Sequence, residues 1–275
     1  MKKKISILLL IIIGINNSVS FSQQDSINVY QVQYERTLTL EHLYNPLVAT
    51  YEYTKFIEYN KSIYKKKRNS IKSNSTLIKD KNDDSNLFFN SSEKNTSVVF
   101  KDYGKNEFFS KHEVNYRYFV VKDSLTIFNW SIKSKKKEIL GFSCQLASMD
   151  YRGRKYEAWF TTELPVGGPW KYDGLPGMIL ELKSIDNFIA FKTISIKNNK
   201  IKLDALKNPF KTKKALSWSQ FTALYKKKTL ELFSYQFDEG DSAPGVVSSR
   251  GGIEFYISED DREYNKALKA HHKKQ

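Results

Sequence analysis

The single cysteine of this 275-residue chain, Cys144, has the clearest potential for covalent chemistry. A thiolate becomes a nucleophile when a neighbouring base or cation lowers the pKa of the thiol. His112 is the histidine whose strand-like surroundings could supply that base. Cys144 lies among alternating apolar residues, however, and a buried cysteine behaves as a small apolar side chain. We therefore expect Cys144 to be structural, and an enzyme that uses it with His112 is the less favoured hypothesis.

Other groups that could support catalysis or bind a metal occur in patterns typical of solvated segments. The acidic pairs Asp83-Asp84 and Asp260-Asp261 lie in polar stretches, and His271-His272 lacks a third ligand nearby. One cysteine permits neither an intramolecular disulfide nor a cysteine-based zinc site. The sequence contains no Gly-rich phosphate loop, no G-x-S-x-G elbow and no H-E-x-x-H motif. We predict no catalytic residue, no metal site and no cofactor.

A dense group of glycines and prolines, the Gly/Pro segment (165–177), is the strongest candidate for a binding site. Leu175 to Met178 have the composition of a type II turn, in which Gly177 would take a positive φ. A rigid loop flanked by two indoles could cover or brace the opening of a barrel. The candidate binding residues are Trp159, Pro169, Trp170, Gly174, Leu175, Pro176 and Gly177. Turn formation alone explains the same glycines and prolines equally well, so both interpretations stay open.

The first 22 residues have the layout of a cleavable signal peptide. Lys2, Lys3 and Lys4 precede an apolar run from Ile5 to Ile15, and small residues follow up to Ser22. The apolar run is shorter than the ~20 residues that cross a bilayer. We expect an exported protein that is periplasmic or associated with the outer membrane after cleavage.

The charge balance bears on the partners of an exported protein. The formal net charge is +15, and it falls to +12 when the three lysines of the leader are removed. In the cytoplasm such an excess would suggest nucleic acid, but we expect no nucleic-acid partner after export. An anionic membrane surface or an acidic protein partner is the alternative. A general bias toward lysine that serves solubility explains the charge as well.

Short alternating segments separated by turns predict an antiparallel β protein. In Tyr30 to Leu40 the even positions are mostly apolar, as in a half-buried strand, and similar segments recur from 97 to 196. Ser217 followed by Gln220 is a capping box, and apolar residues at helical spacing predict a helix over about 217–233. The expected fold is mainly β, a strongly curved antiparallel sheet or half-open β-barrel with at least one packed helix.

The expected organisation is a signal peptide (1–22), one β-rich domain (23–237) and a polar, basic C-terminal tail (238–275). Residues 60–96 are rich in Lys, Ser, Asn and Asp, and we interpret most of them as a long polar excursion from the sheet. The tail should be loosely ordered at its end.

Four consecutive motifs between residues 139 and 184 resemble the GLPGLI family. They are Ile139 to Ala147, Arg152 to Thr161, Leu164 to Lys171, and Gly174-Leu175-Pro176-Gly177-Met178-Ile179, which resembles the motif that names the family. Met178 stands where that motif has leucine, a volume-conserving change. The resemblance implies an exported cell-envelope protein of Gram-negative bacteria, of largely unassigned function, with a fold similar to half-open β-barrels that carry lipids or lipoproteins.

Three functions remain open. The favoured one is a non-catalytic envelope accessory that binds an apolar ligand or a lipidated or protein segment on the concave face. The second is a partner protein of an outer-membrane transporter or peptidase that binds through its basic surface, in which case salt should weaken the association. The third is an enzyme that uses Cys144.

Overall fold

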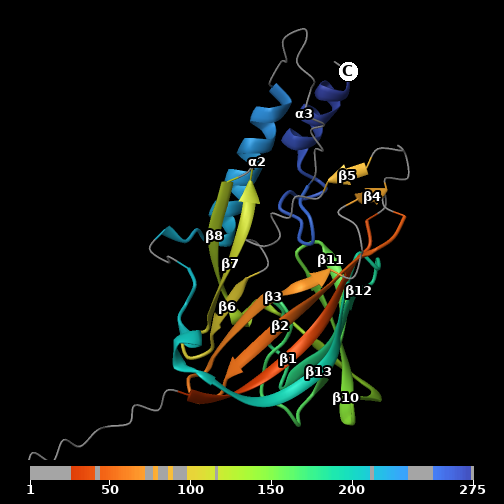
Figure 1. Ribbon diagram of the computed structural model, residues 1–275. Coiled ribbons are helices and arrows are strands. Elements are labelled where there is room, and N and C mark those ends of the chain that lie inside the picture. The colour runs from red at the N-terminus through yellow and green to blue at the C-terminus, as the bar shows by residue number, and fades with distance from the viewer. Residues whose placement is uncertain are drawn as a thin grey trace, which may run out of the picture.

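A computed structural model describes residues 26–40, 44–71, 77–79, 86–88, 98–114, 117–210, 214–234 and 250–273. The predicted signal peptide (1–22) lies outside these residues, so export stays a prediction. The described chain is mainly β, as predicted, with two α-helices at one end of a curved sheet (Figure 1).

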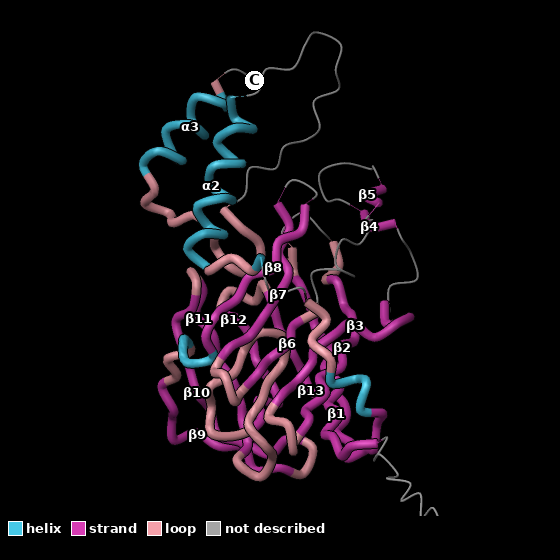
Figure 2. Tube along the Cα trace, turned by 90° about the vertical axis from the view of Figure 1, so that its left-hand side faces the viewer, coloured by secondary structure: helices cyan, strands magenta, loops and turns pink. Residues whose placement is uncertain are grey.

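Eleven strands form one antiparallel sheet in the order β8-β7-β6-β3-β2-β1-β13-β12-β11-β10-β9. The sheet curls around a core but does not close, because its two edge strands, β8 and β9, do not pair with each other in the described structure (Figures 1 and 2). The strands are β1 (Ser26–Leu38), β2 (Leu47–Phe56), β3 (Lys61–Ile71), β6 (Val99–Asp102), β7 (Glu107–Val114), β8 (Arg117–Ser124), β9 (Ser131–Ile139), β10 (Phe142–Tyr151), β11 (Arg154–Thr161), β12 (Met178–Ser184) and β13 (Ile189–Lys202). β4 (Leu77–Lys79) and β5 (Asn86–Phe88) form a separate ladder.

Strand β1 buries side chains on both of its faces, which are the inner and the outer face of the sheet. Val32 and Tyr34 are fully buried in the main core, as the even-numbered alternation predicts. Ile27 and Val29 belong to a second cluster under the 3₁₀ turn Leu203–Leu206, which crosses the outer face. The inner face carries most of the apolar core.

The predicted excursion at 60–96 is wrong at its beginning, because Lys61–Ile71 is strand β3 of the main sheet. Tyr64 points inward and its ring stacks on that of Tyr51 with centroids 5.1 Å apart. Lys65 and Lys67 on the other face are exposed, whereas Ser62, on the same face as Tyr64, is buried. Pairing with β2 and β6 therefore determines the strand, and local hydropathy does not reveal it.

Two turns interrupt the alternating stretch between residues 97 and 196. Thr126 to Ile132 is not one strand, because Leu125–Ile127 forms a 3₁₀ turn and β9 begins only at Ser131. Ile139 to Ala147 is interrupted by a tight turn at Leu140 and Gly141, whose φ angles are 52° and 83°. Positive φ at both positions suits a two-residue hairpin, which joins β9 to β10.

The predicted helix is confirmed as α2 (Trp218–Ser234). The Gln220 amide donates to Ser217 Oγ over 3.2 Å, and the Ser217 amide donates to Gln220 Oε1 over 2.9 Å, which is the expected capping box. Phe221 is fully buried against Val114 and Val121 of β7 and β8. Figure 2 shows the helix beside the ends of these strands.

The polar, basic tail (238–275), which was expected to be loosely ordered at its end, is folded over its described residues 250–273. Residues 250–257 fold against the sheet, and α3 (Arg262–His272) packs on α2 through Tyr264 and Phe233. Asp261 caps α3 by accepting a hydrogen bond from the Tyr264 amide. Residues 235–249 lie outside the described chain. Among the described helices, none is long and apolar enough to cross a membrane.

Candidate functional site

The Gly/Pro segment joins β11 to β12 and lies against the inner face of the sheet. Gly167 occupies a place beside Met178, and the Ile179 amide donates to the Gly167 carbonyl over 2.9 Å. The Tyr172 ring is fully buried, with its centroid 5.0 Å from that of Tyr156 and 5.8 Å from that of Phe191. The segment is therefore part of the core of the protein.

A buried ion pair fixes the end of this segment to strand β6. Lys101 is 1% exposed, and its Nζ donates to Asp173 Oδ2 over 2.8 Å and to the carbonyls of Tyr172 (2.8 Å) and Gly168 (3.2 Å). Tyr103 also donates to Asp173 Oδ2 over 2.7 Å. Three acceptors satisfy the three N–H groups of the ammonium, so the cation is neutralised and fully hydrogen-bonded inside the core.

A second buried cluster, the Lys171–Glu254 cluster, joins the same segment to the C-terminal region. It consists of Lys171, Glu254, Arg152, Asp123 and His112. Lys171 pairs with Glu254. Arg152 donates through Nη1 to Glu254 Oε1 over 2.7 Å and pairs through Nη2 with Asp123. Lys171 Nζ lies 2.9 Å from His112 Nε2, so it donates to a neutral imidazole. Two cations and two carboxylates balance; Lys171 and Glu254 are buried, and Arg152 and Asp123 are partly exposed.

Burial and charge set the protonation of this cluster. Desolvation lowers the pKa of Lys171 to about 8, although Glu254 opposes the shift. Desolvation also acts on Glu254 and would raise its pKa, but Lys171 and Arg152 outweigh it and hold that pKa at about 2. Burial followed by the Lys171 charge lowers the pKa of His112 well below its ordinary value. At neutral pH the glutamate is therefore ionised and the histidine is neutral.

The predicted type II turn at Leu175 to Met178 is wrong. Positive φ angles occur at Trp170 (48°) and Gly174 (87°), and Gly177 is not among the residues with positive φ. The Gly177 amide instead donates to the Leu175 carbonyl over 2.8 Å across Pro176, as in a three-residue turn. Gly177 is required for another reason, because a Cβ there would lie 1.9 Å from the Thr161 carbonyl oxygen.

The seven predicted binding residues do not form one exposed surface in the described structure. Pro169, Leu175 and Gly177 are buried, Trp159 and Trp170 are half-buried, and Gly174 and Pro176 are exposed. Lys137 Nζ lies 4.5 Å from the ring centroid of Trp159, whereas Trp170 packs edge-on against Tyr172. The two indoles therefore have separate surroundings.

Sequence reasoning missed the charged partners of the segment. Lys101 looks like an ordinary lysine of a strand, and Glu254 lies in the part of the chain expected to be a tail. The alternation of Lys171, Tyr172 and Asp173 beside turn-forming residues was the available signal, since buried charges need partners from elsewhere in the chain.

The structure does not bring Cys144 and His112 together as a nucleophile and its base. Both ring nitrogens of His112 have other partners, which are Ser110 and Lys171 at Nε2 and Tyr256 at Nδ1. Cys144 is 1% exposed, and its Sγ donates to the Phe142 carbonyl over 3.5 Å. Desolvation raises the pKa of the thiol to about 11. This thiol is in the protonated, unreactive form at neutral pH.

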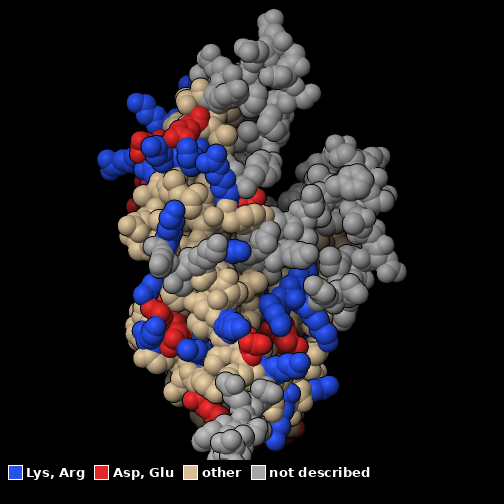
Figure 3. Space-filling model, turned by 60° about the vertical axis from the view of Figure 1, so that its left-hand side comes forward, with Lys and Arg blue, Asp and Glu red and all other residues tan. Residues whose placement is uncertain are grey.

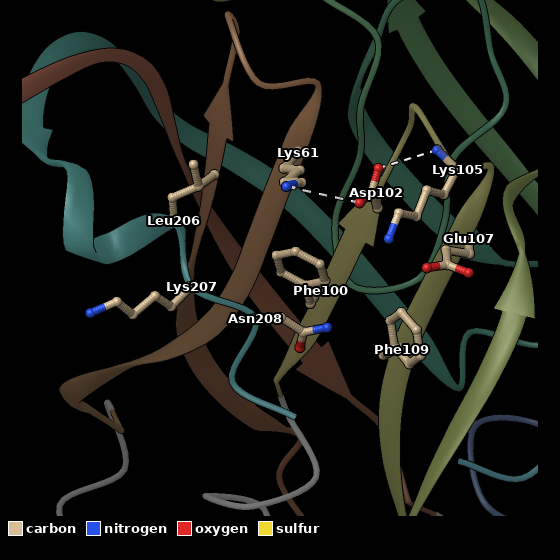
Figure 4. A pocket seen from close by; sticks show the side chains of 9 residues that line it. All are labelled: Lys61, Phe100, Asp102, Lys105, Glu107, Phe109, Leu206, Lys207 and Asn208. Atoms are coloured by element: carbon tan, nitrogen blue, oxygen red, sulfur yellow. Dashed lines mark hydrogen bonds and ion pairs between the residues drawn. The ribbon is translucent and has the colours of Figure 1, made fainter. Parts of the chain in front are cut away.

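The outer face of the sheet carries a pocket of about 290 Å³ where the chain after the Leu203–Leu206 turn crosses β3, β6 and β7 (Figure 4). Phe100 and Phe109, which are directly opposite each other in the ladder, form its apolar wall. Lys61 faces Asp102 at 4.0 Å on the rim. The complete lining is Lys61, Phe100, Asp102, Lys105, Glu107, Phe109, Leu206, Lys207 and Asn208.

Residues 149–181 match a family described as "Protein of unknown function (Porph_ging)". The matched stretch includes Arg152, Lys171 and Asp173, which hold the two buried clusters together. No curated protein matches the chain.

Among solved structures, the chain is similar to PNGF-II in two crystal forms. The form in space group P21 has 15% sequence identity and a TM-score of 0.43, with 74% of this chain and 34% of that chain covered. The form in space group C2 has 16% sequence identity and a TM-score of 0.40, with 69% of this chain and 30% of that chain covered. The chain thus spans about a third of the length of PNGF-II. An uncharacterised conserved protein from Thermus thermophilus has 8% identity and a TM-score of 0.31, with 69% of this chain and 90% of that chain covered.

The close approach at Gly177 predicts a large effect of a single methyl group. Gly177→Ala should lower the free energy of unfolding by about 1–3 kcal/mol or more, because the Thr161 carbonyl must move. Urea unfolding measures this change. Gly252→Ala is the matched control, since a Cβ there meets nothing within 4 Å. Equal stability of the two variants would contradict the packing argument.

The Glu254 pKa predicts how stability depends on pH. The folded-state pKa of about 2 lies below the ordinary 4.5, so the carboxylate stabilises the fold fully above pH 4.5 and loses this effect as pH falls toward 2. The loss should be roughly 3 kcal/mol in wild type and absent in Glu254→Gln. Urea unfolding of both proteins between pH 2 and pH 6 measures the difference. Glu263→Gln is the control, because Glu263 is an exposed glutamate of α3. A wild-type advantage that is the same at pH 3 and pH 6 would sink the assignment.

Burial of Cys144 predicts that the native thiol resists alkylation. Iodoacetamide at neutral pH should leave the folded protein unmodified and should label Cys144 once the chain is unfolded in urea, as intact mass reports. Native labelling as rapid as that of the unfolded chain would restore the thiol-enzyme hypothesis.

Proposed function

We propose that this protein is an exported, non-catalytic accessory of the cell envelope that binds the apolar part of a ligand or of a lipidated or protein segment. The observation that carries the proposal is the aromatic pocket on the outer face, with lysines on its rim. Export and an envelope location rest on the leader-like residues 1–22 and on the resemblance of residues 139–184 to the GLPGLI family.

The inner face is an unfavourable place for a ligand, although the sequence suggested it. Tyr172 and the apolar side chains of the inner strands already fill that space. The outer pocket is different because it lies on the surface beside the exposed Lys105 and Lys207, although Phe100 and Phe109 are themselves only 3% and 4% exposed. Its volume is at the lower end of the ~300–1,000 Å³ typical of ligand pockets, which suits one acyl chain end or one large side chain.

The charges of the rim favour an apolar group that has a negative charge beside it. Lys61, Lys105 and Lys207 face two carboxylates, Asp102 and Glu107, so the lining has one positive charge in excess. Glu107 is already paired with Lys122 from the neighbouring strand. An anionic head group or an acidic residue next to the inserted group would therefore bind with favourable charge.

Surface charge away from the pocket is mixed. On the face seen in Figure 3, Lys and Arg side chains lie over the helices and the lower body with Asp and Glu among them. This distribution supports local recognition at the pocket over a single broad electrostatic surface. The exposed lysines of edge strand β9, Lys133, Lys135 and Lys136, are the strongest basic feature for the alternative, a protein partner or an anionic membrane surface.

Native mass spectrometry of the mature protein from its own envelope tests the proposal, with an organic extraction in parallel. We expect a bound mass that extraction removes. Leu206→Asp should abolish this bound mass, because it places a carboxylate in the apolar part of the pocket. Lys105→Glu with Lys207→Glu should reduce it through the rim charge.

Lys200→Glu with Lys202→Glu is the matched control, since both lysines are exposed and outside the pocket. This variant should retain the bound mass. A protein without a bound mass, or one recovered only together with another polypeptide, would overturn the ligand proposal. Either result would favour the alternative function, a partner protein of an outer-membrane transporter or peptidase. A cytoplasmic chain that retains residues 1–22 would overturn the exported location.

A further inference from the structure

Residues 250–257 form a compact element, the knob, that is organised by its own hydrogen bonds. The amides of Tyr256 and Ile257 both donate to the Arg250 carbonyl, over 2.7 and 3.0 Å. Gly251 has a φ of 144°, and a Cβ there would lie 2.2 Å from the Glu254 carbonyl oxygen. Glycine thus permits the tight fold that presents Glu254 at the tip of the knob. Such internal order reduces the entropy lost on docking.

The knob enters a socket formed by the β10–β11 turn, Lys171 and His112. The Phe255 amide donates to the Arg152 carbonyl over 3.0 Å, and Arg154 Nε donates to the Ile253 carbonyl over 3.0 Å. The Phe255 ring lies over Gly153, where a Cβ would be 2.2 Å from it. The turn therefore matches the knob in shape as well as in hydrogen bonding.

Charge makes this docking strongly favoured once the socket exists. Glu254 is 1% exposed and supplies the carboxylate that pairs with Lys171. Without the knob, Asp123 still pairs with Arg152, but Lys171 keeps only uncharged neighbours, the His112 imidazole and the Trp170 ring. A buried cation that loses its carboxylate is strongly destabilised, so an empty socket is unfavourable.

The knob belongs to an arm, residues 250–273, that contributes no strand to the described sheet. Beyond the socket, the arm packs on α2, through Tyr264 on Phe233 and through Asp261 with Lys226 at 2.9 Å. Ser234 of α2 and Arg250 of the arm are 16 positions apart in the sequence. The arm of a second molecule carries the same residues and can make the same contacts, as in an exchange of identical elements between protomers.

We propose that the socket is a peptide-binding site for this knob, and that a second copy of the chain can fill it. The result is an arm-exchanged dimer in which the partner's Glu254 neutralises Lys171. Docking within one chain dominates at low protein concentration, and exchange increases with concentration. The ligand class is a folded peptide that carries a glutamate followed by an aromatic residue.

Mixing two complementary variants of the full chain tests the proposal. Glu254→Gln damages the knob and leaves Lys171 without its carboxylate, whereas Lys171→Met damages the socket and leaves Glu254 with Arg152 as its cation. A mixed dimer restores one intact pair and places the two neutral side chains opposite each other. Native mass spectrometry of the concentrated mixture should show dimers of one chain of each kind about tenfold or more in excess of either homodimer.

Glu263→Gln replaces Glu254→Gln in the control mixture, because it makes the same change in the same arm outside the knob. Mixed dimers in equal amount with this control, or two separate monomers in the test mixture, would overturn the proposal.

If either variant does not fold, the wild-type chain provides the test. A protease site is inserted between residues 241 and 242, and one of two preparations is labelled with a heavy isotope. After mixing and cleavage, native mass spectrometry should find arms of one label bound to bodies of the other. Arms that stay only with their original bodies, or that dissociate, would overturn the proposal.

Discussion

Two lysine ammonium groups without access to solvent hold the Gly/Pro segment in place, one at each end of the tripeptide Lys171-Tyr172-Asp173. Lys171 is itself one of these groups and pairs with Glu254, while Asp173 receives the other, Lys101. Between them, Tyr172 fills the centre of the core. The rest of the inner face depends on this arrangement, because a shift of the segment by one residue would place a charge among aromatic rings and Tyr172 near the ion-pair partners.

Such ion pairs need not make the protein more stable than a fully apolar core of the same shape would, because the desolvation of the charges offsets their attraction. Their effect is to select one position of the segment among alternatives. Apolar side chains would tolerate small displacements, whereas Lys101 loses hydrogen bonds to two carbonyls and a carboxylate when the segment moves. This explains how a loop with few regular hydrogen bonds can be a fixed part of a protein interior.

The features that sequence reasoning predicted correctly are those encoded by short-range patterns. The alternation in β1 and the capping box at Ser217 and Gln220 each depend on residues that are neighbours in the chain. The features that it missed depend on distant partners. Residues 61–71 form a strand because they pair with β2 and β6, and Glu254 is buried although it lies in the expected tail. Gly177 was correctly singled out, but glycine is required there because the Thr161 backbone is close, and not because of a positive φ.

The sequence distances within the buried clusters have a consequence for biosynthesis. Asp173 follows Lys101 by 72 residues, and Glu254 follows Lys171 by 83. A nascent chain that has emerged only as far as α2 already contains Lys171 and the apolar residues around it, but not the carboxylate that allows them to pack together. The interior can complete its folding only after residue 254 has been synthesised, since contacts between distant residues form late and leave apolar surface exposed in the meantime. A chain of this kind stays loosely packed until the segment that carries Glu254 has been added.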